Sequence, residues 1–258
     1  MNRGVDLNSD MGESFGAWSM GDDAAMLKIV TSANVACGFH AGDPLVMAET
    51  ATQAKANNVD IGAHPSFMDL WGFGRRQIRG DSPADIEKMI AYQIGALRGV
   101  AAMVGHKVTH VKAHGALSNM AAVENDLARA IARGIRAVDR ELIFVIMPMT
   151  ELEKAGDTEG LKMAREVFAD RAYDDTGNLV SRKLPGAMLH DVEEAAQRML
   201  RMVSDGVIEC ASGKRIKVDI DTICVHGDNP AAVAMASAVR TTLEQAGVPL
   251  RHLKDIVG

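Results

Sequence analysis

Short apolar runs alternate with longer stretches of helical spacing along most of the chain. Seven runs of four to six residues predict strands, and the continuous apolar run at 142–147 is typical of a strand buried on both faces. The predicted strands cover residues 5–8, 32–37, 59–63, 108–111, 142–147, 166–169 and 222–225. Because helical segments separate successive strands, we expect a parallel sheet, whose neighbouring strands need crossover connections.

Helix start and stop signals support this alternation. Asp43 can cap a helix over 43–57 with Pro44 at its first helical position, which explains Asp43 without a catalytic role. Ser82 begins a helix that Gly105 ends. Further helices are predicted over 124–138, from a capping box at 191 to Gly206, and from Asn229 and Pro230 to Gly247. Seven or eight strand–helix units fit a single closed (β/α) barrel over residues 1–258, with an open doubly wound sheet as the alternative.

Charge and cysteine content narrow the class of protein. The 258 residues carry 28 Lys and Arg against 34 Asp and Glu, a net charge of −6, whereas a nucleic-acid-binding protein would carry a basic patch. The sequence shows neither a secretory signal nor an apolar stretch of 18 residues, so we expect no membrane association. The three scattered cysteines form no disulfide framework or zinc motif. We therefore expect a cytoplasmic protein with reduced thiols.

Polar residues gather where the predicted strands end. With a period of two, Asp6, Asn8 and Asp10 share one face of the first strand. The later strands are followed or ended by Asn34, Cys37, His40, His64, Lys112, His114, His226 and Asp228. Four of the eight histidines thus lie just past strand ends. Because the active site of a parallel barrel lies at the carboxyl ends of its strands, this pattern predicts one polar site on that rim.

Other polar or reactive residues are expected to be structural. Cys37 is interpreted as a small buried hydrophobic residue, since nothing in the sequence indicates a lowered pKa. Asp219 and Asp221 alternate with apolar residues and predict a solvated strand edge, and Asp228 could be a turn residue or a functional one. The histidines expected at the surface or at caps are His106, His110, His190 and His252.

A second concentration of candidate chemistry is the loop 71–76, which reads WGFGRR. Its glycines let the backbone approach a ligand closely, and Arg75 and Arg76 supply forked donors suited to phosphate or carboxylate. The alternative is a tight loop with solvated arginines. The sequence contains no Walker-type phosphate loop, no dinucleotide fingerprint after the first strand and no G-x-S-x-G elbow.

These blocks resemble the LamB/YcsF family of 5-oxoprolinase A subunits. The matching blocks follow the order of the family and span nearly the whole chain, which makes the resemblance specific. They are VDLNSDMGESFG at 5–16, TSANVACGFHAGDP at 31–44, IGAHP at 61–65, GFGRR at 72–76, HVKAHGAL at 110–117, EVFADRAY at 166–173 and CVHGD at 224–228.

The resemblance implies a fold and a reaction. The fold would be a seven-stranded (β/α) barrel of the glycoside hydrolase and deacetylase type. The reaction would be the ATP-dependent hydrolytic opening of 5-oxo-L-proline, a cyclic amide, to L-glutamate, with two partner subunits, B and C. ATP would be a co-substrate of the complex, and the sequence does not show which subunit binds it. The oligomeric state, including a homo-oligomer, is left open.

For this reaction we assign candidate roles to the rim residues. The candidate catalytic residues are Asp10, His64, Lys112, His114 and His226, which would supply acid–base and electrostatic chemistry. The candidate substrate-binding residues are Asn8, Glu13, Asn34, His40, Arg75 and Arg76. In this assignment the two arginines neutralise phosphate charge.

Two alternatives stay open. The first is a metal-dependent carbohydrate deacetylase or amidohydrolase, in which Asp10, His40 and His64 hold a divalent metal, because imidazole and carboxylate ligands serve together in such sites. The second is a non-catalytic sugar-binding subunit. Metal content would discriminate the first alternative, and turnover with and without the partners the second.

Overall fold

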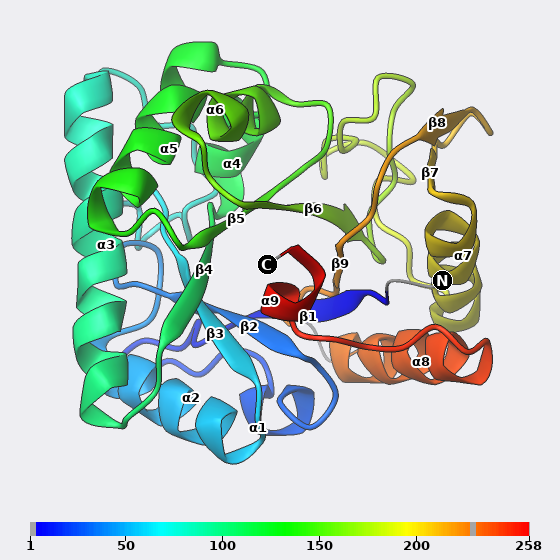
Figure 1. Cartoon of the computed structure of the whole chain (residues 1–258), viewed down its shortest axis with the longest axis horizontal. Coiled ribbons are helices and arrows are strands. Elements are labelled where there is room, and N and C mark those ends of the chain that lie inside the picture. The colour runs from blue at the N-terminus through cyan, green and yellow to red at the C-terminus, as the bar shows by residue number, and fades with distance from the viewer. Residues whose placement is uncertain (1–3, 228–230, 258) are drawn as a thin grey trace.

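Seven parallel strands close into a barrel, because β9 pairs with both β1 and β6 (Figure 1). The structure is a computed structural model that describes residues 4–227 and 231–257. The barrel strands are β1 (Asp6–Met11), β2 (Ser32–Ala36), β3 (Asp60–His64), β4 (Val108–Lys112), β5 (Ile143–Ile146), β6 (Met163–Phe168) and β9 (Thr222–Cys224). All seven predicted strands are therefore confirmed, and so is the closed barrel over the open sheet.

Helices surround the barrel (Figure 1). The predicted helices are confirmed as α2 (Pro44–Ala56), α3 (Pro83–Met103), α5 (Asn125–Val138), α7 (Val192–Asp205) and α8 (Ala232–Gln245). Four shorter ones were not predicted, because four to nine residues give too little helical spacing to recognise: α1 (Asp23–Met26), α4 (Gly115–Ala121), α6 (Glu151–Glu159) and α9 (Leu253–Val257). Among the described residues, no helix is long and apolar enough to cross a membrane. The proposed cap of α8 at Asn229 and Pro230, like Asp228, lies outside the described residues.

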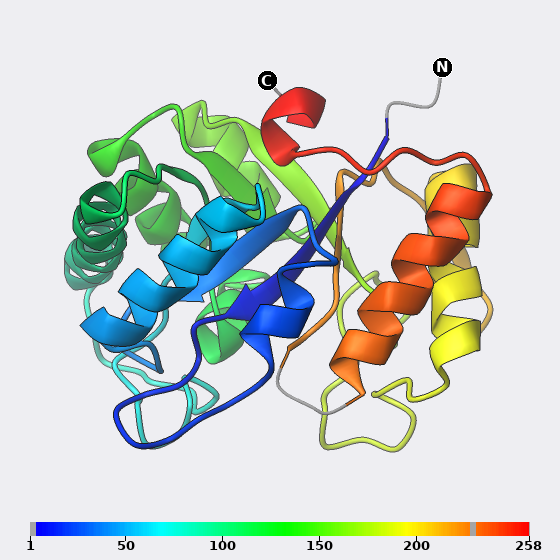
Figure 2. The same cartoon turned by 90° about the horizontal axis from the view of Figure 1, so that it is seen from below.

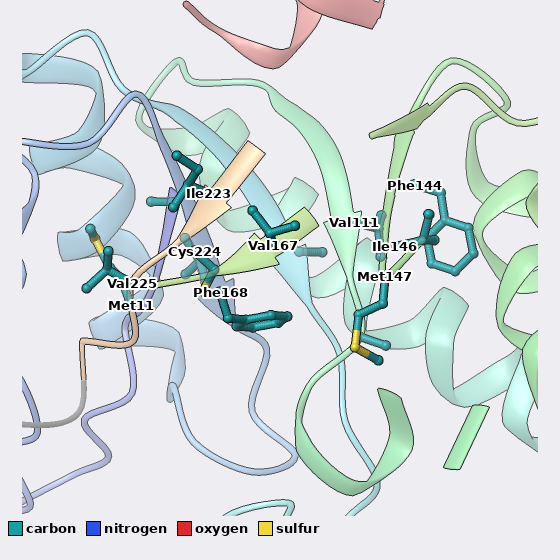
Figure 3. Packing of buried hydrophobic residues seen from close by; sticks show 14 of the residues in the cluster. Met11, Val111, Phe144, Ile146, Met147, Val167, Phe168, Ile223, Cys224 and Val225 are labelled. Atoms are coloured by element: carbon teal, nitrogen blue, oxygen red, sulfur yellow. The ribbon is translucent and has the colours of Figure 1, made fainter. Parts of the chain in front are cut away.

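The side chains of β5 and β6 show how the outer face of the barrel packs. Phe144 points from β5 toward α6 and lies against Gly156 (Figure 3). Ile146 and Val167 are also fully buried in the main hydrophobic cluster. Because this outer face is covered by helices, an apolar side chain at every outward position stabilises the barrel.

A separate small apolar cluster lies at the amino-terminal end of the barrel. It consists of Ile143, Val145, Ala164 and Leu253. Leu253 comes from α9, which lies across this end, opposite the loops that follow β1 and β3 (Figure 2). The opposite end, where those loops lie, is the end that can receive a ligand.

The rest of the barrel interior is polar. Asp6, Asn8 and Asp10 alternate with Leu7, Ser9 and Met11 along β1, and all six residues are buried. The shared face predicted for the three polar residues is confirmed by their mutual partners on β2 and β9, such as Ser32 and Thr222 for Asp6. A polar interior is stable only when its groups are hydrogen-bonded.

Two polar residues were placed incorrectly from the sequence. His110 is fully buried, not at the surface, because Gly62 on β3 leaves room for its ring; a Cβ at Gly62 would lie 2.1 Å from the His110 ring. Asp221 is fully buried and not part of a solvated edge, because its carboxylate accepts a hydrogen bond from the Arg165 amide at 2.8 Å. The strand pair β7 (Val207–Glu209) and β8 (Arg215–Lys217) was not predicted either.

Candidate active site

Polar side chains from β1, β2, β3, β4, β6 and the loops after them converge at the carboxyl end of the barrel. The sequence-predicted residues Asn8, Asp10, Glu13, Asn34, His40, His64, Lys112 and His114 are all buried there. They come from four different strands and the loops that follow them, so only closure of the barrel brings them together. The rim predicted from strand ends is therefore where these groups lie.

Lys112 is the centre of one half of this site. Its Nζ lies 2.9 Å from Asp10 Oδ1 and 2.7 Å from Glu166 Oε1, and 3.1 Å from Cys224 Sγ. Burial alone would lower the pKa of Lys112, but the carboxylates of Asp10 and Glu166 outweigh burial and hold it well above the usual value. Lys112 is thus a permanent cation that can stabilise negative charge, and it is not a base.

Asp10 remains ionised in the same environment. Burial alone would raise the pKa of Asp10, but its contacts with His64 and Lys112 outweigh burial and hold the pKa well below the usual value. Asp10 Oδ2 lies 3.3 Å from His64 Nε2, so this carboxylate joins the lysine to the histidines of the site.

Asn8 and Asn34 connect the strands beneath these charges. The Asn8 amide donates to Glu166 at 3.1 Å and to Thr222 at 2.7 Å, and its oxygen accepts from Asn34 and Lys112. Asn34 also donates to Asp10 at 2.9 Å and accepts from His110 at 3.1 Å. Because these bonds use the hydrogen-bonding capacity of both amides, the geometry favours a positioning role over the substrate contact assigned from the sequence.

The other half of the site is a cluster of Glu13, His40, His64 and His114. The rings of His40 and His114 stack with centroids 3.8 Å apart, and His114 Nδ1 lies 3.0 Å from His64 Nε2. Glu13 Oε1 lies 3.3 Å from His40 Nε2. Burial, reinforced by the neighbouring histidines, holds the pKa values of His40 and His114 well below the usual value, so both rings are neutral near pH 7.

The glycine-rich loop holds this cluster in place. The Phe73 carbonyl accepts a hydrogen bond from His114 Nε2 at 2.9 Å. Gly74 has φ +62°, and a Cβ on it would lie 2.2 Å from Ser66 Oγ and 2.7 Å from His114. Gly74 therefore satisfies both a positive-φ requirement and a close approach of backbone to site.

The two arginines of this loop differ. Arg76 forks onto Asp69, whose carboxylate also accepts from the Gly72 amide, so Arg76 shapes the loop. Arg75 is exposed and its guanidinium lies 4.9 Å from the centre of the Phe73 ring, beside the histidine cluster. Of the two, Arg75 is the one placed to meet a bound anion.

His226 forms a dyad with Asp170 on the far side of Lys112. Its Nδ1 lies 2.8 and 2.9 Å from the two carboxylate oxygens of Asp170, and its ring stacks on Phe168. Burial alone would raise the pKa of Asp170, but the His226 ring outweighs burial, and the pKa lies below its usual value. Such a carboxylate orients a histidine and selects its tautomer.

Glu166 and Asp170 were missed as site residues. Glu166 lies inward on β6, and Asp170 follows the end of that strand. The same strand-end criterion that selected His226 would have selected both. Cys37 is buried as expected, and burial raises the pKa of its thiol to about 12, so it is no nucleophile.

Two groups of these residues could hold a metal ion. Glu13, His40, His64 and His114 each offer one ligand atom within 4.8 Å of the others, and so do Asp10, Cys224 and His226. The predicted set of Asp10, His40 and His64 is thus divided between the two groups. Imidazole and carboxylate together suit zinc, manganese or iron.

Comparisons with known proteins place this geometry in context. Over 243 residues the chain is 60% identical to the 5-oxoprolinase A subunit of Rhodopseudomonas palustris, covering 94% of this chain and 96% of that protein. It is 55% identical to a second-numbered 5-oxoprolinase A subunit of Bradyrhizobium diazoefficiens, covering 97% and 98%.

Solved structures agree. The lactam utilization protein from Thermus thermophilus superposes with a TM-score of 0.91 at 45% identity, covering 96% of this chain and 99% of that one. A structure of T48 deacetylase with substrate shares the fold alone, with a TM-score of 0.50 at 12% identity, covering 98% and 90%. Residues 5–258 match the LamB/YcsF family. The resemblance seen in the sequence blocks is thereby confirmed, and the chain belongs to the LamB/YcsF family.

Proposed function

We propose that this chain is the A subunit of an ATP-dependent 5-oxoprolinase, which opens 5-oxo-L-proline to L-glutamate. The observation that carries the proposal is 60% identity over nearly the whole chain to a protein named as a 5-oxoprolinase A subunit. The buried rim site supports it, because it combines a permanent cation, ionised carboxylates and neutral imidazoles. This combination suits hydrolysis of an unreactive amide.

The chemistry explains why ATP is needed. A five-membered lactam is a stable amide with a poor leaving group. Phosphorylation of the lactam oxygen would activate the ring carbon toward water. Overall, one water adds across the ring C–N bond, and a second water accounts for the hydrolysis of ATP to ADP and phosphate. Because the sequence has no Walker motif, we assign ATP binding to the complex and not to this chain alone.

Each half of the site takes one part of the reaction in this proposal. Lys112 stabilises negative charge that develops on the reacting carbonyl oxygen. Asp10 accepts the proton of the attacking water. His226, whose Nδ1 is bound to Asp170, gives a proton from Nε2 to the ring nitrogen as the C–N bond breaks. Arg75 binds the phosphate charge, and His64 and His114 shape the substrate pocket.

The partners would dock at the same end of the barrel. Large apolar side chains are exposed on the loops after β1 and β3 and at the start of α2, including Trp18 (67%), Leu45 (81%), Met68 (68%) and Trp71 (90%). The loops hold together through bonds from Gly16 to Asp43 and from Asp69 to Phe39. Exposed tryptophans beside a site indicate a protein interface, and here we assign it to subunits B and C.

Reconstitution tests the proposal. The chain is mixed with the two partner subunits, and glutamate and ADP are measured with 5-oxo-L-proline present or absent. We expect both products in equal amounts from the full mixture only, and negligible ATP hydrolysis by the isolated chain. Asp170→Asn should keep the folded state and lower kcat about 100-fold, because the His226 tautomer is no longer selected.

Matched variants complete this test. Trp71→Ala should weaken assembly, whereas Met103→Ala, which removes an equally exposed side chain at the far end of α3, should not. Full turnover without partners, or full turnover by Asp10→Asn, would contradict the proposal. Stoichiometric zinc with deacetylase activity would favour the metal-dependent alternative, and ligand binding without turnover would favour the sugar-binding subunit.

A further inference from the structure

The tautomers of His64 and His114 are determined by their backbone partners. His64 Nδ1 lies 2.7 Å from the Lys112 carbonyl oxygen, and His114 Nε2 lies 2.9 Å from the Phe73 carbonyl oxygen. A carbonyl oxygen only accepts, so each of these nitrogens carries the hydrogen. In the neutral rings, the remaining nitrogens, His64 Nε2 and His114 Nδ1, then carry lone pairs.

These two lone-pair nitrogens face each other at 3.0 Å. Carboxylate oxygens approach the same pair: Asp10 Oδ2 lies 3.3 Å from His64 Nε2, and Glu13 Oε1 lies 3.6 Å from His114 Nδ1. All four atoms are electron-pair donors, and all four side chains are at least nine-tenths buried. Such a convergence is unfavourable unless a cation lies among them.

The buried charges give a second, independent reason. The carboxylates of Asp10, Glu13 and Glu166 lie around the single ammonium of Lys112 and the neutral histidines. Three carboxylates exceed one ammonium by two negative charges, in a region removed from water. A divalent cation would balance that excess, whereas one proton shared by His64 and His114 would balance only half of it.

The fourth member of the cluster also has an unsatisfied atom. His40 Nδ1 is buried without a hydrogen-bond partner among the described residues. Its Nε2 lies 3.3 Å from Glu13 Oε1, so this ring approaches the carboxylate that faces His114. The ring of His40 can therefore close one side of a site built by the other three residues.

We propose that His64 Nε2, His114 Nδ1 and the carboxylates of Asp10 and Glu13 bind one divalent transition-metal ion. Nitrogen ligands lie about 2.0–2.1 Å from such an ion, so a separation of 3.0 Å suits two adjacent positions in its coordination sphere. The hydrogen bonds to Lys112 and Phe73 are the outer contacts that orient metal-binding imidazoles. A bound ion would polarise a carbonyl oxygen or lower the pKa of a water. The site differs from the sequence-predicted set by including His114 and Glu13.

Cobalt titration of the full chain tests this site without partners, ATP or 5-oxo-L-proline. The purified protein is analysed for metal, stripped with a chelator and titrated with Co²⁺, whose visible absorption reports coordination by histidine. We expect saturation at one equivalent and a higher melting temperature with Co²⁺, Zn²⁺ or Mn²⁺. His114→Ala should bind Co²⁺ about 100-fold more weakly, and His190→Ala, which changes an exposed histidine, should bind normally.

A second variant covers the case in which His114→Ala does not fold. Glu13→Gln keeps the size of the side chain and removes one ligand charge, so it should weaken Co²⁺ binding about 10-fold or more. The proposal is overturned if the wild-type chain shows no Co²⁺ absorption and no metal-dependent melting shift, or if the variants bind as the wild type does. Metal binding without 5-oxo-L-proline turnover would retain this site and refute the proposed function.

Discussion

The barrel interior has two unlike walls. The wall formed by β1 to β4 carries Asp6, Asn8, Asp10, Ser32, Asn34, His64, His110 and Lys112, whereas the wall at β5 and the start of β6 carries Ile143, Val145 and Ala164. The polar wall is held by side-chain hydrogen bonds between strands, and the apolar wall by packing against Leu253 of α9. Both are buried to a similar degree.

The difference shows how the fold separates stability from chemistry. A polar group inside the barrel needs a partner for each donor and acceptor, so a change in one residue affects several strands. An apolar residue needs only volume. We therefore expect substitutions in the polar wall to affect activity and stability together, and substitutions in the apolar wall to affect stability alone.

The largest effect is expected from Lys112→Met. It leaves the carboxylates of Asp10 and Glu166 buried without their cation, which should cost about 3–5 kcal/mol of unfolding free energy and abolish turnover. Urea unfolding and the reconstituted assay measure the two effects. Lys154→Ala, which removes an exposed ion pair with Glu151, should stay within about 0.5 kcal/mol of the wild type.

Leu253→Ala should show the contrasting behaviour of the apolar wall. Truncating this fully buried side chain should cost about 3 kcal/mol through lost burial and the cavity left behind. Because α9 lies at the end of the barrel opposite the site, kcat of the folded protein should not change. Leu45→Ala, at an exposed leucine, is the control for stability. A loss of kcat in Leu253→Ala would show that the two walls are coupled.

Asp6 allows a test of the polar wall by pH. Burial raises the pKa of its carboxyl to about 6, despite hydrogen bonds from Thr31, Ser32 and Thr222. The folded state therefore holds this proton more tightly than the unfolded state, and the stability contributed by the group is lost as pH rises from about 4 to 6. The stability of Asp6→Asn relative to wild type should rise across that window, by at most about 3 kcal/mol. Parallel unfolding curves at each pH would contradict this assignment.

Arg75 and Arg76 sharpen the comparison at the edge of the polar wall. Arg75→Ala should lower kcat/KM of the complex about 10- to 150-fold by removing hydrogen bonds to a charged ligand, with little change in melting temperature. Arg75→Lys should be impaired less, because it keeps the charge and loses the fork. Arg76→Ala should act on the loop through Asp69 and lower the melting temperature. Unchanged kcat/KM in both Arg75 variants would end the phosphate-binding assignment.

The strand-end criterion was productive for the site because the barrel brings all carboxyl strand ends to one rim. It found Asp10, His64, Lys112 and His114 from their positions alone. It failed where partners mattered. Asn8 and Asn34 were taken as substrate contacts, yet the structure gives them bonds to other strands. His110 was placed outside, because nothing local shows that Gly62 on another strand makes room for its ring.

The sequence by itself determined the order of strands and longer helices, the inward face of β1 and the rim on which the chemistry lies. Alternation, caps and apolar runs are local properties, and each acts over a few residues. Only the tertiary structure decided that Lys112 meets Asp10 and Glu166, that Asp170 orients His226, and that His64 and His114 turn their lone pairs toward each other. These contacts join residues far apart in the chain, and their distances and tautomers follow from barrel closure and from backbone carbonyls that no sequence pattern records.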